Sequence, residues 1–257
     1  MRGHARFVFE TLVSLVLAGL VWEVLVRATG VPAYLIPAPS GAFAEARAVF
    51  PLLMHHTGIT VAGTVTSLVL GAIIGVMLGV LIGYSAIASK LLYPLIGGFH
   101  AVPVSAFIPI FAVWFGIGSM PKVIAGVFIA FFPIAVNVVT GLRTIEAELW
   151  EMMRSLRASR MQVLMKIGIP RAVPYFFASL KIAAAGAFIG NVVGEMIAAG
   201  SGLGYMLLVA TNRMEMELAF CALIVLLLLG MLIFSVFDML EKIVAPWAFR
   251  SHGSGTT

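Results

Sequence analysis

Apolar residues gather into six long segments, which polar or proline- and glycine-rich stretches separate. A helix that crosses a bilayer needs about 20 predominantly apolar residues, and each segment reaches that length. The pattern predicts an all-α polytopic membrane protein with a single transmembrane domain over residues 1–257. The predicted spans lie near 7–27, 57–84, 89–115, 119–141, 172–198 and 217–240.

Composition supports this interpretation, because 61% of the residues are hydrophobic, only 11% are charged and the mean hydropathy is +1.10. A soluble domain carries about 25% charged residues, so most of these helices must face lipid or other apolar helices. The formal net charge is +5. The charges lie between apolar segments rather than along one basic face, so we expect no nucleic-acid partner. The single cysteine, Cys221, lies in an apolar run and is interpreted as a small buried side chain.

The distribution of Lys and Arg predicts the orientation. Six spans place both termini on one side, and the positive-inside rule assigns that side to the cytoplasm. Lys181, in the inner part of the fifth span, can extend inward. The inner side then carries Arg2, Arg6, Lys90, Arg143, Arg154, Arg157, Arg160, Lys166, Arg171, Lys242 and Arg250, whereas the outer side carries Arg27, Arg47, Lys122 and Arg213.

The second predicted span carries a glycine at every fourth position. Gly71, Gly75, Gly79 and Gly83 share one helix face, and small residues at this spacing let a second helix backbone approach closely. We interpret this face as a packing surface.

The third predicted span differs from a plain lipid-facing helix, because prolines and glycines interrupt it, Pro103 and Pro109 among them. Backbone groups that such breaks set free are tolerated at membrane depth only inside protein or along a wet cavity. We therefore assign His100 and Ser105 of this segment to a candidate translocation path, together with Asn137 of the fourth span.

Glu195 is the acidic residue best placed within the membrane, in the segment 190–195 that also holds Asn191. An ionisable side chain at that depth favours a function in the translocation path, and a structural ion pair or hydrogen bond to a neighbouring helix is the alternative. Both interpretations remain open for Glu195, and Asn191 joins the candidate path. The stretch 199–205, with Gly202 and Gly204, is too rich in glycine to continue a helix. It predicts a re-entrant or gating loop, here called the gating loop.

Three prolines stiffen the segment 32–40 on the outer side. Ser40 at its end belongs to the residue types that cap helix N-termini. We expect a short amphipathic helix from Ser40 toward Phe50.

The stretch 144–170, between the fourth and fifth spans, is too charged to cross a membrane and too apolar for a disordered loop. Apolar residues recur at helical spacing, and Ser159 with Gln162 matches a capping box that opens a second short helix. Ile169–Pro170 is expected to end that helix. The stretch predicts a cytoplasmic hairpin of two helices, which could be an interfacial element, a packed connector or a docking element for a cytosolic subunit.

The hairpin resembles the EAA loop that marks the permease subunits of binding-protein-dependent ABC importers. The matching residues are Glu151, position 157 and the segment 167–170. Further stretches are similar to the nitrate, sulfonate, taurine and bicarbonate branch of that family, at 99–103, 114–118, 132–137, 193–196 and 202–205.

The chain departs from the EAA pattern at two places. Met152 and Met153 stand where the family has alanines, and Arg157 stands where it has glycine. Glycine suits the left-handed turn that closes a helix, and another residue there costs about 1–2 kcal/mol. Either the turn has another geometry here or that cost is tolerated.

The resemblance implies an inner-membrane permease in a bacterium, forming the path for a small solute such as an oxyanion, a sulfonate or a similar organic anion. A second permease copy, expected to be identical, would lie beside it. Two cytosolic ATPase subunits would bind ATP and Mg²⁺, and an extracytoplasmic binding protein would deliver the solute. The residues implied in coupling to the ATPase are Glu151, Arg154, Leu156, Arg157, Ala158, Ser159 and Pro170.

The chain contains no phosphate-binding G-x-x-x-x-G-K-[ST] loop, no H-E-x-x-H metal pair and no G-x-S-x-G nucleophile elbow. We therefore expect a transport subunit rather than an enzyme, with no cofactor or metal of its own. A stand-alone secondary transporter or channel is the alternative. It would predict paired broken helices in two matching halves, and the sequence shows no such repeat.

Overall fold

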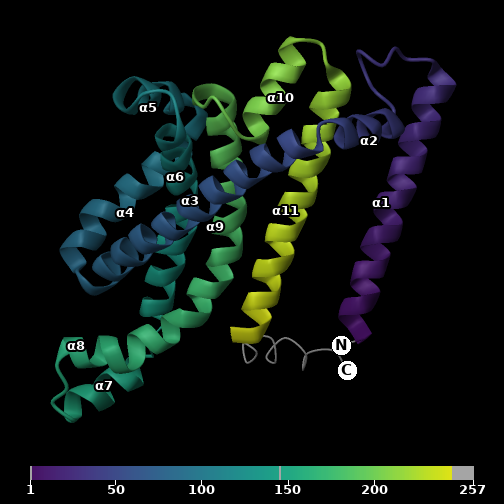
Figure 1. The fold of residues 1–257 in the computed structure, drawn as a ribbon. Helices are drawn as coiled ribbons and strands as arrows, with labels where there is room; N and C mark the ends of the chain where they lie inside the picture. Colours follow the sequence, from purple (N-terminus) through teal and green to yellow (C-terminus); the bar gives the residue numbers. More distant parts are fainter. Residues whose placement is uncertain (1, 145, 245–257) are drawn as a thin grey trace.

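The computed structural model describes residues 2–144 and 146–244. Within these residues, the side chains at 2–12, 15, 147, 150, 154, 160 and 242 lie outside the description. The described part contains helices and no strand. In chain order (Figure 1) the elements are α1 (Arg2–Thr29), α2 (Pro39–Ala48), α3 (Phe50–Tyr84), α4 (Ala86–Ala101), η1 (Val104–Ala106), α5 (Ile108–Phe115), α6 (Ser119–Arg143), α7 (Ala147–Ser155), α8 (Arg160–Val163), the π-helix η2 (Leu164–Gly168), α9 (Ile169–Ala198), α10 (Leu203–Asn212) and α11 (Met216–Val244).

The centre of the molecule is formed by α3, α6 and α9, whose backbones approach closely at glycines. A Cβ atom added to Gly71 would lie 2.7 Å from Ala130 Cβ, and one added to Gly79 would lie 2.7 Å from Val138 Cβ. On α9, a Cβ atom added to Gly190 would lie 2.8 Å from a backbone carbonyl oxygen of α6. The predicted glycine face of the second span is therefore confirmed as a packing surface, and it packs on α6.

Four helical stretches are long and apolar enough to cross a membrane. They are Phe50–Tyr84, Ser119–Arg143, Met161–Ala198 and Met216–Glu241. A fifth candidate is the pair of α4 with the helices after it, which is bent by 82°. The helix α1 covers the first predicted span, but the side chains of its first part lie outside the description. The first predicted span, and with it the total of six spans, therefore stays a prediction.

The third predicted span is broken where the prolines stand. α4 ends just before Val102–Pro103, and α5 begins with Pro109 in its first turn. A proline disfavours helical backbone at the residue before it, and Val102 has an extended ψ of 130°. The predicted interruption is confirmed, so the segment 89–115 is not one straight helix.

The helix predicted after the proline-rich segment is present as α2, but the prediction that Ser40 caps it is wrong. The N-cap is Ala38 and makes no side-chain cap hydrogen bond, and α2 begins at Pro39, whose fixed φ suits the first helical position. Ser40 donates instead to Glu23 of α1, from its N–H to Oε2 at 3.0 Å and from its hydroxyl to Oε1 at 2.8 Å. Arg27 pairs with the same carboxylate at 2.6 Å, so Glu23 connects α1 to the start of α2.

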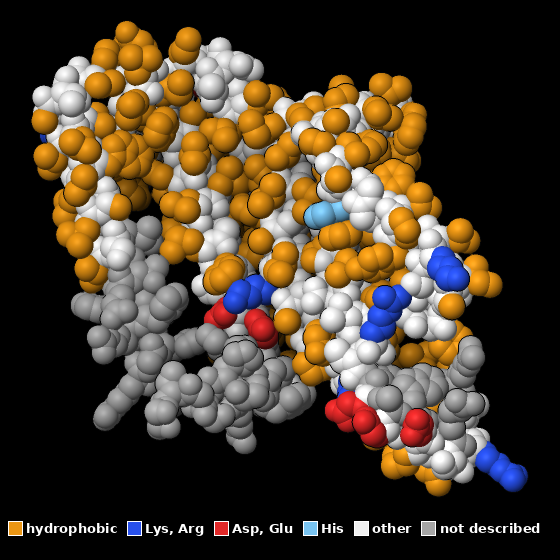
Figure 2. Space-filling view, turned by 180° about the vertical axis from the view of Figure 1, so that it is seen from behind, with side chains coloured by type: hydrophobic (Ala, Val, Ile, Leu, Met, Phe, Trp, Pro, Cys, Tyr) orange, Lys and Arg blue, Asp and Glu red, His pale blue; other side chains and the backbone are white. Residues whose placement is uncertain are grey.

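On one face of the molecule, charged side chains gather at one end and apolar side chains cover the rest. Figure 2 shows hydrophobic side chains over most of the visible face, while Lys, Arg, Asp and Glu gather toward the end that carries α7 and α8. The start of α10 lies at the opposite end (Figure 1). The charged hairpin and the gating loop therefore lie at opposite ends of an apolar body.

The close approach of α3 to α6 can be tested at Gly75. A Cβ atom there would lie 2.7 Å from the Phe131 carbonyl oxygen and 2.8 Å from Ile134 Cβ, so we expect Gly75→Ala to destabilise the fold by about 1–3 kcal/mol. Gly58 on the same helix has nothing within 4 Å of its added Cβ. Gly58→Ala should therefore keep or raise the melting temperature of the purified chain. Equal melting temperatures for the two variants would contradict this packing.

Candidate functional site

A buried polar network joins α3, α6, α9 and α10, and Glu195 of α9 is its centre. The carboxylate accepts hydrogen bonds from Lys122 Nζ at 3.1 Å, from the Thr60 hydroxyl at 2.9 Å, from Asn191 Nδ2 at 3.2 Å and from the Gly204 N–H at 3.0 Å. Glu195, Asn191 and Thr60 are 0% exposed and Lys122 is 2% exposed. Donors from four elements therefore meet at one carboxylate.

The ion pair between Lys122 and Glu195 is compensated despite its burial. A buried charge without a partner is strongly destabilising, whereas a pair with further hydrogen bonds is tolerated. The structure thus shows the ion pair that was one of the two alternatives for Glu195, and its role in a translocation path stays a prediction. Lys122, expected among the basic residues of the outer side, lies in the first turn of α6 and is withdrawn from the surface.

The network also fixes the start of α10. The first N–H groups of a helix have no partner within the helix, and a carboxylate near that end is favoured by the helix dipole. Here side chains of α3 and α9 accept from three successive N–H groups: Gly202 donates to His56 Nδ1 at 2.9 Å, Leu203 to Thr60 Oγ1 at 2.8 Å and Gly204 to Glu195 Oε2 at 3.0 Å.

Steric constraints explain why both positions of the gating loop are glycine. Gly202 has a φ of +110°, and a Cβ atom there would collide with the Glu195 carboxyl group. A Cβ atom on Gly204 would collide with the Val192 carbonyl oxygen. α10, with 10 residues, is about 15 Å long and too short to cross a bilayer. The predicted break after α9 is confirmed, and the gating role of Gly202 and Gly204 stays a prediction.

Three residues of the network were missed by the sequence analysis. His56 and Thr60 lie one helical turn apart near the outer end of the second span, and Lys122 stands alone at the start of the fourth. One signal in the sequence could have identified Lys122, because a carboxylate within the membrane usually pairs with a basic side chain.

The structure brings together only two of the five residues assigned to the path, Asn191 and Glu195. His100 is an exposed side chain of α4 that stacks on Phe132, with ring centroids 3.8 Å apart and planes 6° apart. Ser105 is exposed in η1. Asn137 of α6 donates to the carbonyl of residue 133 at 2.8 Å. Among the described residues, no hydrogen bond connects these three to the network, and their path role stays a prediction.

The hairpin has the turn expected of the EAA pattern although glycine is absent. Arg157 lies in the left-handed region with a φ of 52°. The Ala158 N–H donates to the Met153 carbonyl oxygen at 3.0 Å, the 6→1 closure of a Schellman motif. Of the two alternatives for Arg157, the turn is therefore kept, and its cost of about 1–2 kcal/mol is tolerated.

The capping box of the second hairpin helix is confirmed. The Ser159 N–H donates to Gln162 Oε1 at 2.8 Å, and the Gln162 N–H donates to Ser159 Oγ at 3.2 Å. The prediction that Ile169–Pro170 ends this helix is wrong. Helical backbone continues through η2 into α9, giving one stretch over Met161–Ala198. Pro170 follows the π-helical turn η2, where the regular backbone bonding that a proline would break is already interrupted.

The hairpin projects from the body (Figure 1) and exposes apolar side chains. Leu156 is 70% exposed, Met161 54% and Met152 50%, and Glu151 is exposed as well. Apolar groups on a projecting charged element are typical of an interaction surface. The side chain of Arg154 lies outside the described residues.

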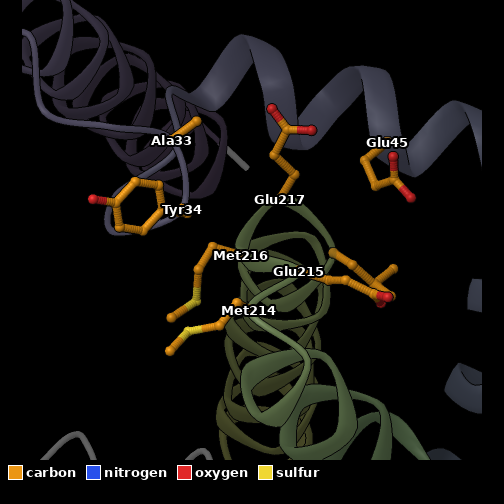
Figure 3. Close-up of a pocket in the computed structure, with 8 residues that line it drawn as sticks. Ala33, Tyr34, Glu45, Met214, Glu215, Met216 and Glu217 are labelled. Carbon is orange, nitrogen blue, oxygen red and sulfur yellow. The ribbon is translucent and has the colours of Figure 1, made fainter.

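A hollow opens beside the turn between α10 and α11. It has a volume of about 370 Å³, and Figure 3 shows acidic side chains around it: Glu45 of α2, Glu215 of the turn and Glu217 of α11. Among the described residues, no group of three His, Cys, Asp or Glu side chains could hold a metal ion. The lining residues are Ala33, Tyr34, Glu45, Met214, Glu215, Met216, Glu217 and Leu218.

Comparison with known proteins finds transport permeases. The profile of the family described as binding-protein-dependent transport system inner membrane component matches residues 71–250. The riboflavin transport system permease protein RibX of Chloroflexus aurantiacus is 35% identical over 96% of this chain and 94% of its own length. The formylaminopyrimidine transport permease protein ThiX of Halalkalibacterium halodurans is 32% identical over 89% of this chain and 91% of its own. The taurine transport system permease protein TauC of Escherichia coli is 29% identical over 61% and 57%.

A solved structure shows the same fold. A chain of the MetNI methionine ABC transporter, in an inward-facing conformation, superposes with a TM-score of 0.64 at 24% identity. The match covers 76% of this chain and 97% of that one.

The buried ion pair can be tested by a double-mutant cycle. Lys122→Met leaves the Glu195 charge without its cation, so we expect a loss of about 3–5 kcal/mol in stability. The double variant Lys122→Met/Glu195→Gln should recover part of that loss, and a coupling energy of about 1 kcal/mol or more should appear in the cycle. Lys90→Met, at an exposed position of α4, is the matched control and should change little. Additive effects at 122 and 195 would rule out the pair.

Proposed function

Because the chain belongs to the family of binding-protein-dependent transport system inner membrane components, it is a permease subunit of an ABC importer, and we propose the assembly and the mechanism by which it works. Two copies lie side by side in a bacterial inner membrane, each with six spans and both termini in the cytoplasm. A cytosolic ATPase subunit binds ATP and Mg²⁺ beneath each copy, and an extracytoplasmic binding protein delivers the solute. The positive-inside distribution of Lys and Arg supports this orientation.

The observation that carries the mechanism is the continuity of the stretch Met161–Ala198. Its first turn follows the capping box of the hairpin, and its last turns hold the Glu195 carboxylate that fixes the start of α10. Rigid secondary elements with packed side chains can carry a displacement between distant sites. We infer that closure of the ATPase subunits moves the hairpin, that α9 transmits the movement, and that the gating loop opens or closes the path.

Docking on the ATPase is assigned to the hairpin residues at its exposed turn. Leu156 supplies apolar area, while Glu151 and the basic residues of the turn orient the contact. The rigid geometry of the turn supports this, because Arg157 and Ser159 lie in defined capping motifs on either side of Ala158. A stand-alone transporter or channel would have no use for a projecting element of this kind.

The solute is a small organic molecule, and the charges of the spans distinguish two candidates. An organic anion fits the relationship to TauC. A neutral heteroaromatic solute fits RibX and ThiX, which match more of the chain, and it fits the described lysines of α6 and α9, since Lys122 pairs with Glu195 and Lys181 pairs with Asp238. Neither of these two lysines is then left uncompensated for an anion. Uptake of riboflavin and uptake of taurine, each measured separately with the complete importer, separate the two candidates.

The docking assignment is tested at Leu156. An apolar side chain of this size contributes about 1.5–3 kcal/mol when buried, so Leu156→Asp should weaken copurification of the ATPase at least tenfold and abolish ATP-dependent uptake. Leu35→Asp places the same change on an exposed leucine of the outer segment and should leave the ATPase bound. Normal recovery of the ATPase with Leu156→Asp would refute the assignment.

A further inference from the structure

The hydrogen bond between the gating loop and His56 has a property that the other bonds of the loop lack. The Gly202 N–H lies 2.9 Å from His56 Nδ1. Because a backbone N–H can only donate, Nδ1 must carry no proton, and in the neutral ring the proton lies on Nε2. A protonated imidazole is a donor at both nitrogens and cannot accept this bond. The contact therefore exists only with neutral histidine.

We propose that His56 is a positioning residue of the gating loop and that acid on the outer side releases the loop through it. Histidine is the side chain type that changes charge most readily near neutral pH, so acid at the extracytoplasmic face of the membrane can protonate the ring. The consequence for transport rests on the proposed function of the loop as a gate. The hydrogen bond between Gly202 and His56 does not depend on that function.

Protonation acts on the loop in two ways that add. It removes the acceptor of the Gly202 N–H, and it places a positive charge beside the start of α10, where the helix dipole is also positive. The bonds of Leu203 to Thr60 and of Gly204 to Glu195 remain. Thr60 does not titrate, and Glu195 forms an ion pair with Lys122. Among the three acceptors, His56 is the imidazole, the side chain type that changes charge near neutral pH.

The groups around His56 decide how readily it takes a proton. His55 on the same helix has its ring centroid 5.7 Å away, and its charge would oppose protonation. Glu195 of α9 favours protonation, but Lys122 of α6 offsets much of its charge. Tyr205 of α10 lies 6.4 Å away between ring centroids. His56 is only half-buried, so water can deliver the proton.

The sign of the pH dependence follows from these contacts. The neutral ring holds the loop, so the stabilisation is present above the pKa of His56 and is lost as the pH falls below it. If each protonation releases the loop, the equilibrium for opening should rise about tenfold per pH unit below that pKa.

Hydrogen exchange of the purified importer measures the bond directly. We expect the protection factor of the peptide covering 199–205, corrected for intrinsic exchange, to fall as the pH is lowered from neutral, by about tenfold per pH unit once the pH lies below the pKa of His56. In His56→Asn the amide oxygen can accept the Gly202 N–H without titrating, so protection should stay high and independent of pH. In His55→Asn, the matched control, the acid-induced loss should persist.

Two outcomes would overturn the proposal. One is protection of 199–205 that does not change with pH in the natural protein, and the other is an undiminished acid-induced loss in His56→Asn. ATP-dependent uptake of riboflavin and of taurine at pH 7.5 is measured on the same samples. Its absence would contradict the proposed function while leaving the exchange result interpretable.

Discussion

The buried carboxylate of Glu195 is the group on which the end of the molecule opposite the hairpin depends. A charge at 0% exposure persists only with close compensation, and here α3, α6, α9 and α10 each contribute a donor. Satisfying the carboxylate therefore fixes the relative positions of four elements. The glycines at 202 and 204 follow from the same constraint, because a side chain at either position would enter the space that the network occupies.

The helical stretch that carries Glu195 begins at the hairpin, so one continuous element joins the charged hairpin to the buried network at the opposite end of the molecule. The π-helix η2 lies where the hairpin becomes α9. π-helical turns interrupt the regular backbone bonding of a helix and recur at functional sites. η2 therefore allows the hairpin a change of angle while it stays joined to α9, which carries the displacement in the proposed mechanism. In that mechanism the gating loop receives the movement through Glu195, and the contact with His56 is the feature that we propose makes the same loop sensitive to acid.

Local patterns predicted the local structure well. The capping box of Ser159 and Gln162 needs only a three-residue spacing, the break at Pro103 follows from proline geometry, and the glycine face of the second span follows from helical periodicity. The partner of Glu195 could not be predicted in this way. Lys122 is 73 positions away, and their contact depends on the register between α6 and α9, which no periodic pattern encodes. The prediction that the helix ends at Pro170 failed for a related reason, because no local sequence pattern predicts a π-helix that continues into α9.

Spin labels at position 200 test most directly whether ATPase closure moves the gating loop. Gly200 is exposed and has open space around its Cβ position, so Gly200→Cys with Cys221→Ala places one label on each copy of the permease. The account predicts that the distance between the two labels changes when ATP is trapped in the complete importer and stays fixed when the ATPase subunits are absent. A distance that is unchanged by trapped ATP in the complete importer would contradict the account.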